Sequence, residues 1–356
     1  LKEINELNYM LKKTIYNFIK GILATSLLIS GENLLVDGEL HFDNMRQLTF
    51  SGENAEAYFS PDGTKLIYQA HDSMEQCDQI FIMDLVSGAT KQVSTGGGVT
   101  TCSYFEYPND SKIIYASTYL GGKDCPPKPD YSLGYIWKLY PDYDVFRANS
   151  NGTKMERLTS SYGYDAEATY AFDGSKIVYT SISSGDLEVW TMDPDGSNKT
   201  QLTDGLGYDG GPFFSHDGSK IVWRAYYPKT EEEIADYKHL LKTNAIRPMA
   251  LQIRIMDADG KNKKQITHND AANFGPFFFP DDKRIIFSSN MNDPKKRNFD
   301  LYAVDINGEN LERITYFDGF DGFPMFSPDG KFFVFASNRN QAKRGDTNIF
   351  ICEWAD

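Results

Sequence analysis

The chain has 356 residues, 40% of them apolar, and its 22 Tyr and 24 Phe are enough to build a large buried core. The 36 basic and 50 acidic residues give a formal net charge of -14. Nucleic acid and anionic membrane surfaces are therefore excluded as general partners, because binding to phosphate requires concentrated Lys and Arg.

The N-terminal stretch is predicted to be a targeting signal. Met10 is followed by Leu11-Lys12-Lys13 and then by a mostly apolar run over residues 15–30. A basic region before a short apolar run is typical of a secretory signal peptide and is too short for a comfortable membrane span. An amphipathic helix is the alternative. We expect a periplasmic or secreted protein with no stable membrane span after signal removal, divided into an upstream extension (1–9), a signal peptide (10–31), a linker (32–44) and a folded domain (45–356).

An isolated strand is predicted at about 45–50, ending in the phrase Arg46-Gln47-Leu48-Thr49. Related phrases recur further along the chain, where a polar residue and an aliphatic residue precede Ser or Thr. They are Gln92-Val93-Ser94, Arg157-Leu158-Thr159, Gln201-Leu202-Thr203, Gln265-Ile266-Thr267 and Arg313-Ile314-Thr315.

A second phrase joins a tight turn to a buried strand and repeats roughly every 44–48 residues, except in two units that are longer by about 20 residues. Ser60-Pro61-Asp62-Gly63 fits a type I turn, because Pro presets φ and Gly closes the turn. The run Leu66-Ile67-Tyr68 after it is typical of a strand. The phrase returns around Asp173-Gly174, Asp217-Gly218, Asp281-Asp282 and Asp329-Gly330, and in degraded form from Pro108.

Each repeat therefore predicts four antiparallel strands, which is the blade of a β-propeller. Five complete units run from about residue 52 to 315, and a sixth unit, 317–356, lacks its fourth strand. The isolated strand at about 45–50 supplies that missing strand, closing the ring and removing two open sheet edges. The predicted fold is all-β, a six-bladed propeller of four-stranded blades.

These Pro-Asp-Gly repeats resemble those of the propeller of bacterial TolB proteins over about 310 residues. The resemblance implies a six-bladed ring of WD-like repeats. The chain departs from TolB itself, because it offers no room for the separate α/β domain that precedes the propeller in TolB. A role in the envelope system of TolB is therefore not carried over, and the chain looks like the stand-alone propellers of that superfamily.

The two longest predicted loops join second to third strands. One spans residues 118–142 and the other 226–249, where Thr230 and Glu233 form a capping box that predicts a short helix. In a four-stranded blade these loops share a face with the connections between blades. Because binding residues concentrate on variable loops of a rigid scaffold, this loop face is the candidate binding surface.

Polar residues recur near the start of the innermost strands, where they are expected to surround the channel mouth. Gathered carboxylates favour a cation, an ammonium group or a basic side chain of a partner. The alternative is that they cap the turns between blades. The candidate binding residues are Asn54, Glu56, Asp165, Glu167, Asp209, Asn273 and Asp321.

The four cysteines lack the spacing of a zinc site. Cys77, Cys102 and Cys125 are expected at the same end of their blades, where two of them can form a disulfide after export, whereas Cys352 is expected to be a buried free thiol.

Catalytic motifs are sparse. No Gly-x-Ser-x-Gly occurs, and only His71 of the five histidines is expected on the loop face, so neither a serine hydrolase nor a His-bound metal enzyme is indicated. We expect no cofactor and predict a module that binds a protein, a peptide or a cationic ligand. The alternative is an enzyme acting on carbohydrate or peptide through carboxylates such as Glu56, Glu167 and Asp209.

Overall fold

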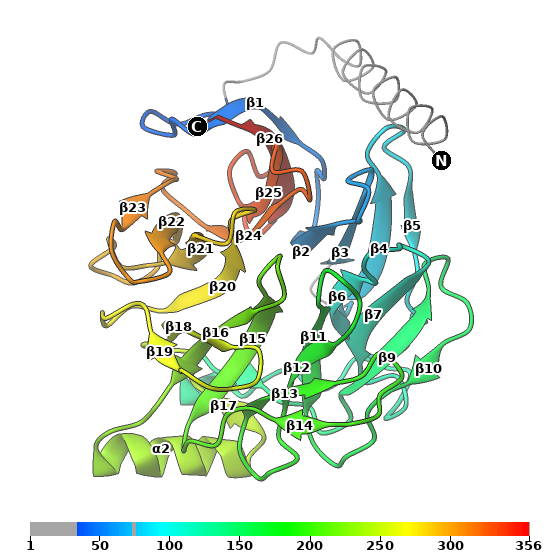
Figure 1. Ribbon diagram of the computed structural model, residues 1–356, viewed down its shortest axis with the longest axis vertical. Coiled ribbons are helices and arrows are strands. Elements are labelled where there is room, and N and C mark those ends of the chain that lie inside the picture. The colour runs from blue at the N-terminus through cyan, green and yellow to red at the C-terminus, as the bar shows by residue number, and fades with distance from the viewer. Residues whose placement is uncertain (1–33, 73–75, 356) are drawn as a thin grey trace.

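The computed structural model describes residues 34–72 and 76–355. The predicted extension and signal peptide lie outside these residues. Six four-stranded antiparallel sheets surround a central axis, so the prediction of an all-β, six-bladed propeller is confirmed (Figure 1).

The blades follow one another along the chain, and each begins with its innermost strand. Blade 1 contains β2 (Glu53–Phe59), β3 (Lys65–His71), β4 (Gln79–Asp84) and β5 (Thr90–Gln92). Blade 2 contains β6 (Thr100–Phe105), β7 (Lys112–Ser117), β9 (Asp144–Asn149) and β10 (Glu156–Arg157). Blade 3 contains β11 (Asp165–Tyr170), β12 (Ile177–Ser181), β13 (Glu188–Met192) and β14 (Thr200–Gln201).

The second half of the ring repeats this order. Blade 4 contains β15 (Tyr208–Phe214), β16 (Lys220–Tyr226), β18 (Gln252–Asp257) and β19 (Lys264–Gln265). Blade 5 contains β20 (Asn273–Phe278), β21 (Arg284–Ser289), β22 (Asp300–Asp305) and β23 (Glu312–Arg313). Blade 6 contains β24 (Asp321–Phe326), β25 (Phe332–Ser337), β26 (Asn348–Trp354) and β1 (Phe42–Gln47).

The core lies in the sheets of the blades and between neighbouring blades. Every second strand has a fully buried aliphatic residue at an equivalent position, and burying such a side chain stabilises the fold by about 1.5–3 kcal/mol. These residues are Ile67, Ile114, Val178, Val222, Ile286 and Val334.

The tight turn between first and second strands is held by its Ser and Asp side chains. The Ser60 hydroxyl donates to Oδ1 of Asp62 at 2.6 Å and accepts from the backbone N–H of Lys65 at 3.0 Å. Gly63 has φ +70°, a conformation that costs glycine little. Blade 5 has Asp282 at this place, with φ +59°, and its carboxylate accepts the backbone N–H of His216, in the corresponding turn of blade 4, at 2.8 Å.

The recurring Gln-Leu-Thr phrase joins the outermost strand to the third strand. Its hydroxyl accepts a backbone N–H from the start of that third strand in every blade, which explains why Ser or Thr recurs there. The pairs, at 2.8–3.0 Å, are Ser94 with Ile80, Thr159 with Val145, Thr203 with Val189, Thr267 with Ile253, Thr315 with Leu301 and Thr49 with Ile349.

The last of these pairs closes the ring. β1 runs antiparallel to β26 as the outermost strand of blade 6, so the predicted closure is confirmed. The strand begins at Phe42, earlier than the predicted start at about residue 45. The difference has a physical reason, because Phe42 is buried against Phe333, Phe335 and Trp354.

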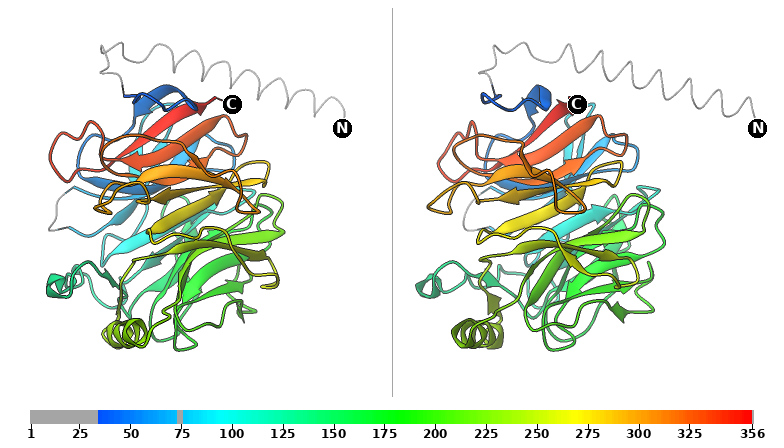
Figure 2. Two further views of the ribbon diagram at one scale, coloured as in Figure 1. Left: turned by 90° about the vertical axis from the view of Figure 1, so that its left-hand side faces the viewer. Right: turned by 60° about the vertical axis from the view of Figure 1, so that its left-hand side comes forward.

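The two long insertions meet above the blades. β8 (Trp137–Lys138), after the 3₁₀ helix η1 (Tyr131–Leu133), pairs with β17 (Ala245–Ile246), which follows the helix α2 (Glu231–Lys242). Thr230 and Glu233 form the predicted capping box. Figure 2 shows η1 and α2 on the same side of the ring, so both insertions lie on the loop face.

Candidate binding site in the central channel

Each innermost strand carries a β-bulge at the same place, after its second or third residue. Bulges redirect side chains and are frequent next to functional sites. The bulged residue has a φ of 52–59° in all six blades, and together these residues line a cavity in the channel. They are Glu56, Cys102, Glu167, Gly211, Gly275 and Phe323.

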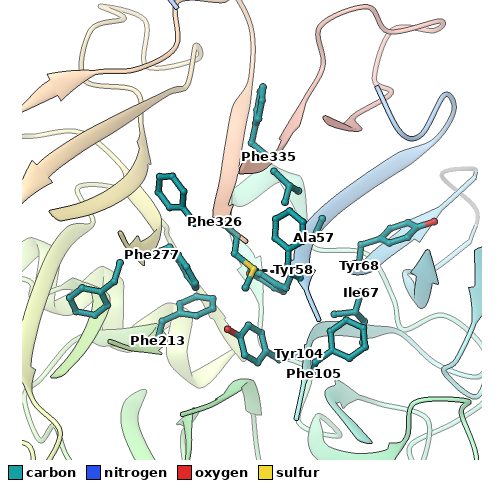
Figure 3. Close-up of a cluster of buried hydrophobic side chains, with 14 of the residues drawn as sticks. Ala57, Tyr58, Ile67, Tyr68, Tyr104, Phe105, Phe213, Phe277, Phe326 and Phe335 are labelled. Atoms are coloured by element: carbon teal, nitrogen blue, oxygen red, sulfur yellow. Dashed lines mark hydrogen bonds between the residues drawn. The ribbon is translucent and has the colours of Figure 1, made fainter. Parts of the chain in front are cut away.

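Aromatic rings close the channel beneath this cavity. The ring of Tyr58 lies 5.4 Å from that of Tyr104 and 5.6 Å from that of Phe213, and Phe213 lies 5.4 Å from Phe277 (Figure 3). These residues follow the bulges, toward the end of the strands that carries the tight turns. The rings thus block access from the tight-turn face, so a ligand must enter the cavity from the loop face.

The cavity has room for about 30 Å³ of solvent, enough for one or two water molecules. Its charged lining consists of Glu56, Glu167 and Arg224, and Tyr58 and Phe213 form part of its floor. The site can therefore enclose a small charged group but not a whole sugar ring or amino acid.

Glu167 is satisfied by its own surroundings. One carboxylate oxygen pairs with the Arg224 guanidinium, and the other accepts from the Thr180 hydroxyl at 2.7 Å and from the Gly211 N–H at 2.8 Å. Both charged side chains are 10% exposed, so their pairing is only weakly screened by solvent.

Arg224 reaches the channel from the second strand of blade 4. A Cβ on Gly211 would lie 2.1 Å from Nη1 of Arg224, so only glycine at that bulge leaves space for the guanidinium. The guanidinium carbon also lies 5.1 Å from the ring of Trp137, in the blade 2 insertion, and 5.6 Å from that of Tyr208, a cation–π arrangement. The loop-face insertion is thereby coupled to the channel.

Glu56 has a different environment. In the described part of the chain, its hydrogen-bond donor is the Cys102 thiol at 4.0 Å, and no ion pair joins Glu56 to a cation. Burial, followed by the negative charge of Glu167, raises the pKa of Glu56 to about 7. Near neutral pH the Glu56 carboxyl group is therefore ionised in part of the molecules and protonated in the rest.

Comparisons with known proteins agree with this architecture. Residues 240–349 match the family described as the TolB beta propeller domain. The solved structure of a putative TolB from Agrobacterium tumefaciens aligns at 18% identity with a TM-score of 0.58, covering 86% of this chain and 91% of that one. This chain is a six-bladed β-propeller, and its residues 240–349 match the TolB propeller family.

Other solved structures share the propeller fold of this chain. TolB from Acinetobacter baumannii aligns at 16% identity and TM-score 0.55, over 75% of this chain but only 55% of that one. A gluconolactonase from Xanthomonas campestris aligns at 11% identity and TM-score 0.57, over 90% of this chain and 94% of that one. Identities this low establish the fold alone. No curated protein matches the sequence.

The structure separates the predicted binding residues of the propeller into two groups. Glu56 and Glu167 lie together in the cavity. The other five are buried in the blade walls, where they contact their own blade, a neighbouring blade or the connections between blades; they are Asn54, Asp165, Asp209, Asn273 and Asp321.

These five side chains are hydrogen-bonded within the fold. Asn54 and Asn273 donate to the carbonyl oxygens of Ser51 and Leu251, at 2.8 and 2.7 Å. Asp165 accepts from Ser161, Asp209 from Trp223 and Tyr227, and Asp321 from Arg339. Burial raises the pKa of Asp209 to about 6. Such contacts match the turn-capping alternative, and a role for these five in binding a partner stays a prediction.

Arg224 is the site residue that sequence reasoning missed. A comparison of the second strands position by position contains the signal, because Arg224 is the single charged residue at a place where the other blades have Gln69, Ala116, Thr180, Ser288 and Ala336.

Among residues 34–72 and 76–355, no group of three or more His, Cys, Asp or Glu side chains is placed to hold a metal ion. Within the same residues, no helix is long and apolar enough to cross a membrane.

Two cysteines of the propeller form a disulfide. Cys77, in the β3–β4 loop of blade 1, is bonded to Cys125 in the blade 2 insertion, with 5.6 Å between their Cα atoms. Cys102, in the channel, and the buried Cys352 are free thiols. The bond fastens the first long insertion to the neighbouring blade.

We expect thiol titration in denaturant to detect two free thiols in oxidised protein and four after reduction, because only Cys77 and Cys125 are paired. A Cys77→Ser variant should expose one additional thiol, that of Cys125, and lower the free energy of unfolding by about 2–4 kcal/mol. Four free thiols in unreduced, exported protein would contradict this pairing.

Proposed function

We propose that this TolB-type propeller is a binding module that takes a protein or peptide partner on its loop face and receives a cationic group of that partner in the channel cavity. The observation that carries the proposal is the cavity itself. It is closed on the tight-turn face by aromatic rings and contains one carboxylate, Glu56, without a cationic partner in the described residues.

The loop face offers apolar anchors around the mouth. Tyr135 and Met249 are 67% and 59% exposed on the two insertions, and Tyr162 is 87% exposed on the connection between blades 2 and 3. Aromatic residues and Met are enriched in protein interfaces. A partner can therefore bury apolar side chains on this face while one charged group reaches inward.

We also propose that the protein works outside the cytoplasm, in the periplasm or after secretion. The disulfide between Cys77 and Cys125 supports this, because such bonds persist in oxidising compartments and are rare in reducing ones.

An enzymatic role gains no support from the same geometry. A carboxylate pair that cleaves glycosides needs room for a sugar ring between its members. The cavity admits only about 30 Å³ of solvent, and Glu167 is already engaged by Arg224, Thr180 and Gly211.

The test is to select peptides from a displayed library on the purified protein and to measure their affinity by fluorescence anisotropy. Tyr135→Ser and Met249→Ser should each weaken binding of the selected peptides by roughly tenfold, as expected for exposed anchors at an interface. Val86→Ser is the matched control, because Val86 is an exposed apolar residue in a tight turn of the opposite face. Failure to enrich any peptide, or equal losses in all three variants, would refute the proposed function.

A further inference from the structure

We propose that the cavity is specific for one primary ammonium group on a slender alkyl chain, the tip of a lysine side chain of the partner. The inference rests on the proposed function and names the chemical group that the cavity selects. Its evidence comes from the charge, the unused acceptors, the size and the floor of the cavity.

The charged residues of the cavity leave one negative charge uncompensated. Arg224 neutralises Glu167 through their ion pair, so the ionised Glu56 gives the cavity a net charge of one negative unit. A single ammonium group balances this charge. A ligand with two positive charges would leave one of them buried without a partner.

A second polar group without a partner lines the same cavity as Glu56. Ser103 lines the cavity and is 1% exposed, yet its hydroxyl has no hydrogen-bond partner among the described residues. Buried hydroxyls are usually satisfied, so this one indicates a missing ligand or water. An ammonium group has three N–H donors and no acceptor, which suits a carboxylate together with a hydroxyl.

Size distinguishes an ammonium group from a guanidinium group. A space of about 30 Å³ accepts a compact ammonium group but not a second planar guanidinium beside that of Arg224. The floor adds a favourable surface, since the rings of Tyr58 and Phe213 can face the cation and pack against its methylene groups.

Binding is expected to release a proton. Burial and the charge of Glu167 raise the pKa of Glu56 to about 7, and a bound ammonium lowers it by stabilising the carboxylate. Affinity should therefore increase from pH 6 to pH 8. The charged or titratable groups that face Glu56 are Tyr58 on β2, Cys102 on β6, Glu167 on β11, Arg224 on β16 and Asp78 before β4.

The experiment uses isothermal titration calorimetry of the whole protein with millimolar n-butylammonium and, for comparison, n-butylguanidinium. Butylammonium should bind at least tenfold more tightly. Titrations in buffers of different ionisation enthalpy should show proton release that is largest at pH 6 and decreases toward pH 8, as expected for a group with a pKa of about 7.

Variants identify the groups responsible. Glu56→Gln should abolish the proton release and weaken butylammonium binding at least tenfold, and Ser103→Ala should weaken it by about fivefold, the effect of one lost hydrogen bond. Glu53→Gln is the matched control, because Glu53 lies on the same strand with a side chain 53% exposed to solvent and outside the cavity lining. It should bind like the wild type.

Each outcome has one meaning. Equal binding of both probes, or binding without proton release, overturns the ammonium inference. Selected loop-face peptides that retain their affinity when lysine is replaced by norleucine also overturn it, while the proposed binding function stands. Absence of any selected peptide refutes the proposed function instead, and butylammonium binding would then show a site for a free small amine.

Discussion

A chain that begins at residue 52 is expected to lose the closed ring. It lacks β1, so β26 becomes an open edge and the Thr49 hydroxyl no longer accepts the N–H of Ile349. The hydrophobic contacts of Phe42 with Phe333 and Phe335 disappear, and Arg339 loses its partner Glu39. These losses together should exceed about 5 kcal/mol, comparable with the whole stability of many domains.

The measurements are thermal unfolding and size-exclusion chromatography with light scattering. The truncated protein should melt at a much lower temperature or without a cooperative transition, and it should associate through the open edge of β26. A chain that begins at residue 34 is the matched control, because it retains every contact described for β1 and should behave like the full chain. A monomeric 52–356 protein with an unchanged melting temperature would contradict this account of closure.

The fold could be predicted because its repeated phrases serve local functions. The tight turn is formed by the side chains and backbone of Ser60, Asp62 and Gly63 themselves. The hydroxyl of Thr49 accepts a backbone N–H of the neighbouring strand, and the equivalent Ser or Thr does the same in the other blades. The start of β1 was misplaced because Phe42 has no counterpart in these phrases. It is ordered by aromatic rings from the opposite end of the chain, a contact that no local pattern indicates.

The site was predicted only in part because a bulge interrupts the strand alternation. In a regular strand, residues two apart face the same side, which would direct Asn54 and Glu56 together into the channel. The bulge at Glu56, with φ +52°, turns this residue into the cavity while Asn54 remains in the blade wall. Asp165 and Glu167 are separated in the same way.

Arg224 could not be placed in the channel from its own strand. Residues of second strands are ordinarily behind the innermost strand, and Arg224 extends past it only because Gly211 has no side chain. The arrangement depends on Gly211 and Arg224, which are 13 residues apart on neighbouring strands, and on Glu167 in another blade. Sequence comparison of the repeats can flag the isolated charge, but the three-dimensional packing determines what it contacts.

Arg339→Met is expected to lower the free energy of unfolding by about 3–5 kcal/mol, because it removes one partner of a buried ion network. The side chains of Glu39 and Asp321 are 0% exposed, and that of Arg339 is 3% exposed. Arg339 donates to Glu39 at 2.9 and 3.0 Å and to Asp321 at 2.8 Å. Chemical denaturation measures the loss, and Lys331→Met is the control, because its partner Asp329 is half exposed and should contribute less than about 1 kcal/mol.

The pH dependence of this loss provides a second test with a defined sign. Burial raises the pKa of Asp321, whereas the charge of Arg339 lowers it. Without Arg339 the pKa should rise further, so the folded variant binds a proton more tightly than its unfolded chain does. Stability of the variant relative to wild type should therefore improve as the pH falls from 8 to 5.5.

The triple variant Glu39→Gln, Asp321→Asn, Arg339→Met should recover part of the loss at pH 8, because no unpaired charge remains buried. A loss in Arg339→Met that is below 1 kcal/mol, or independent of pH, would contradict the stabilising role of the buried network.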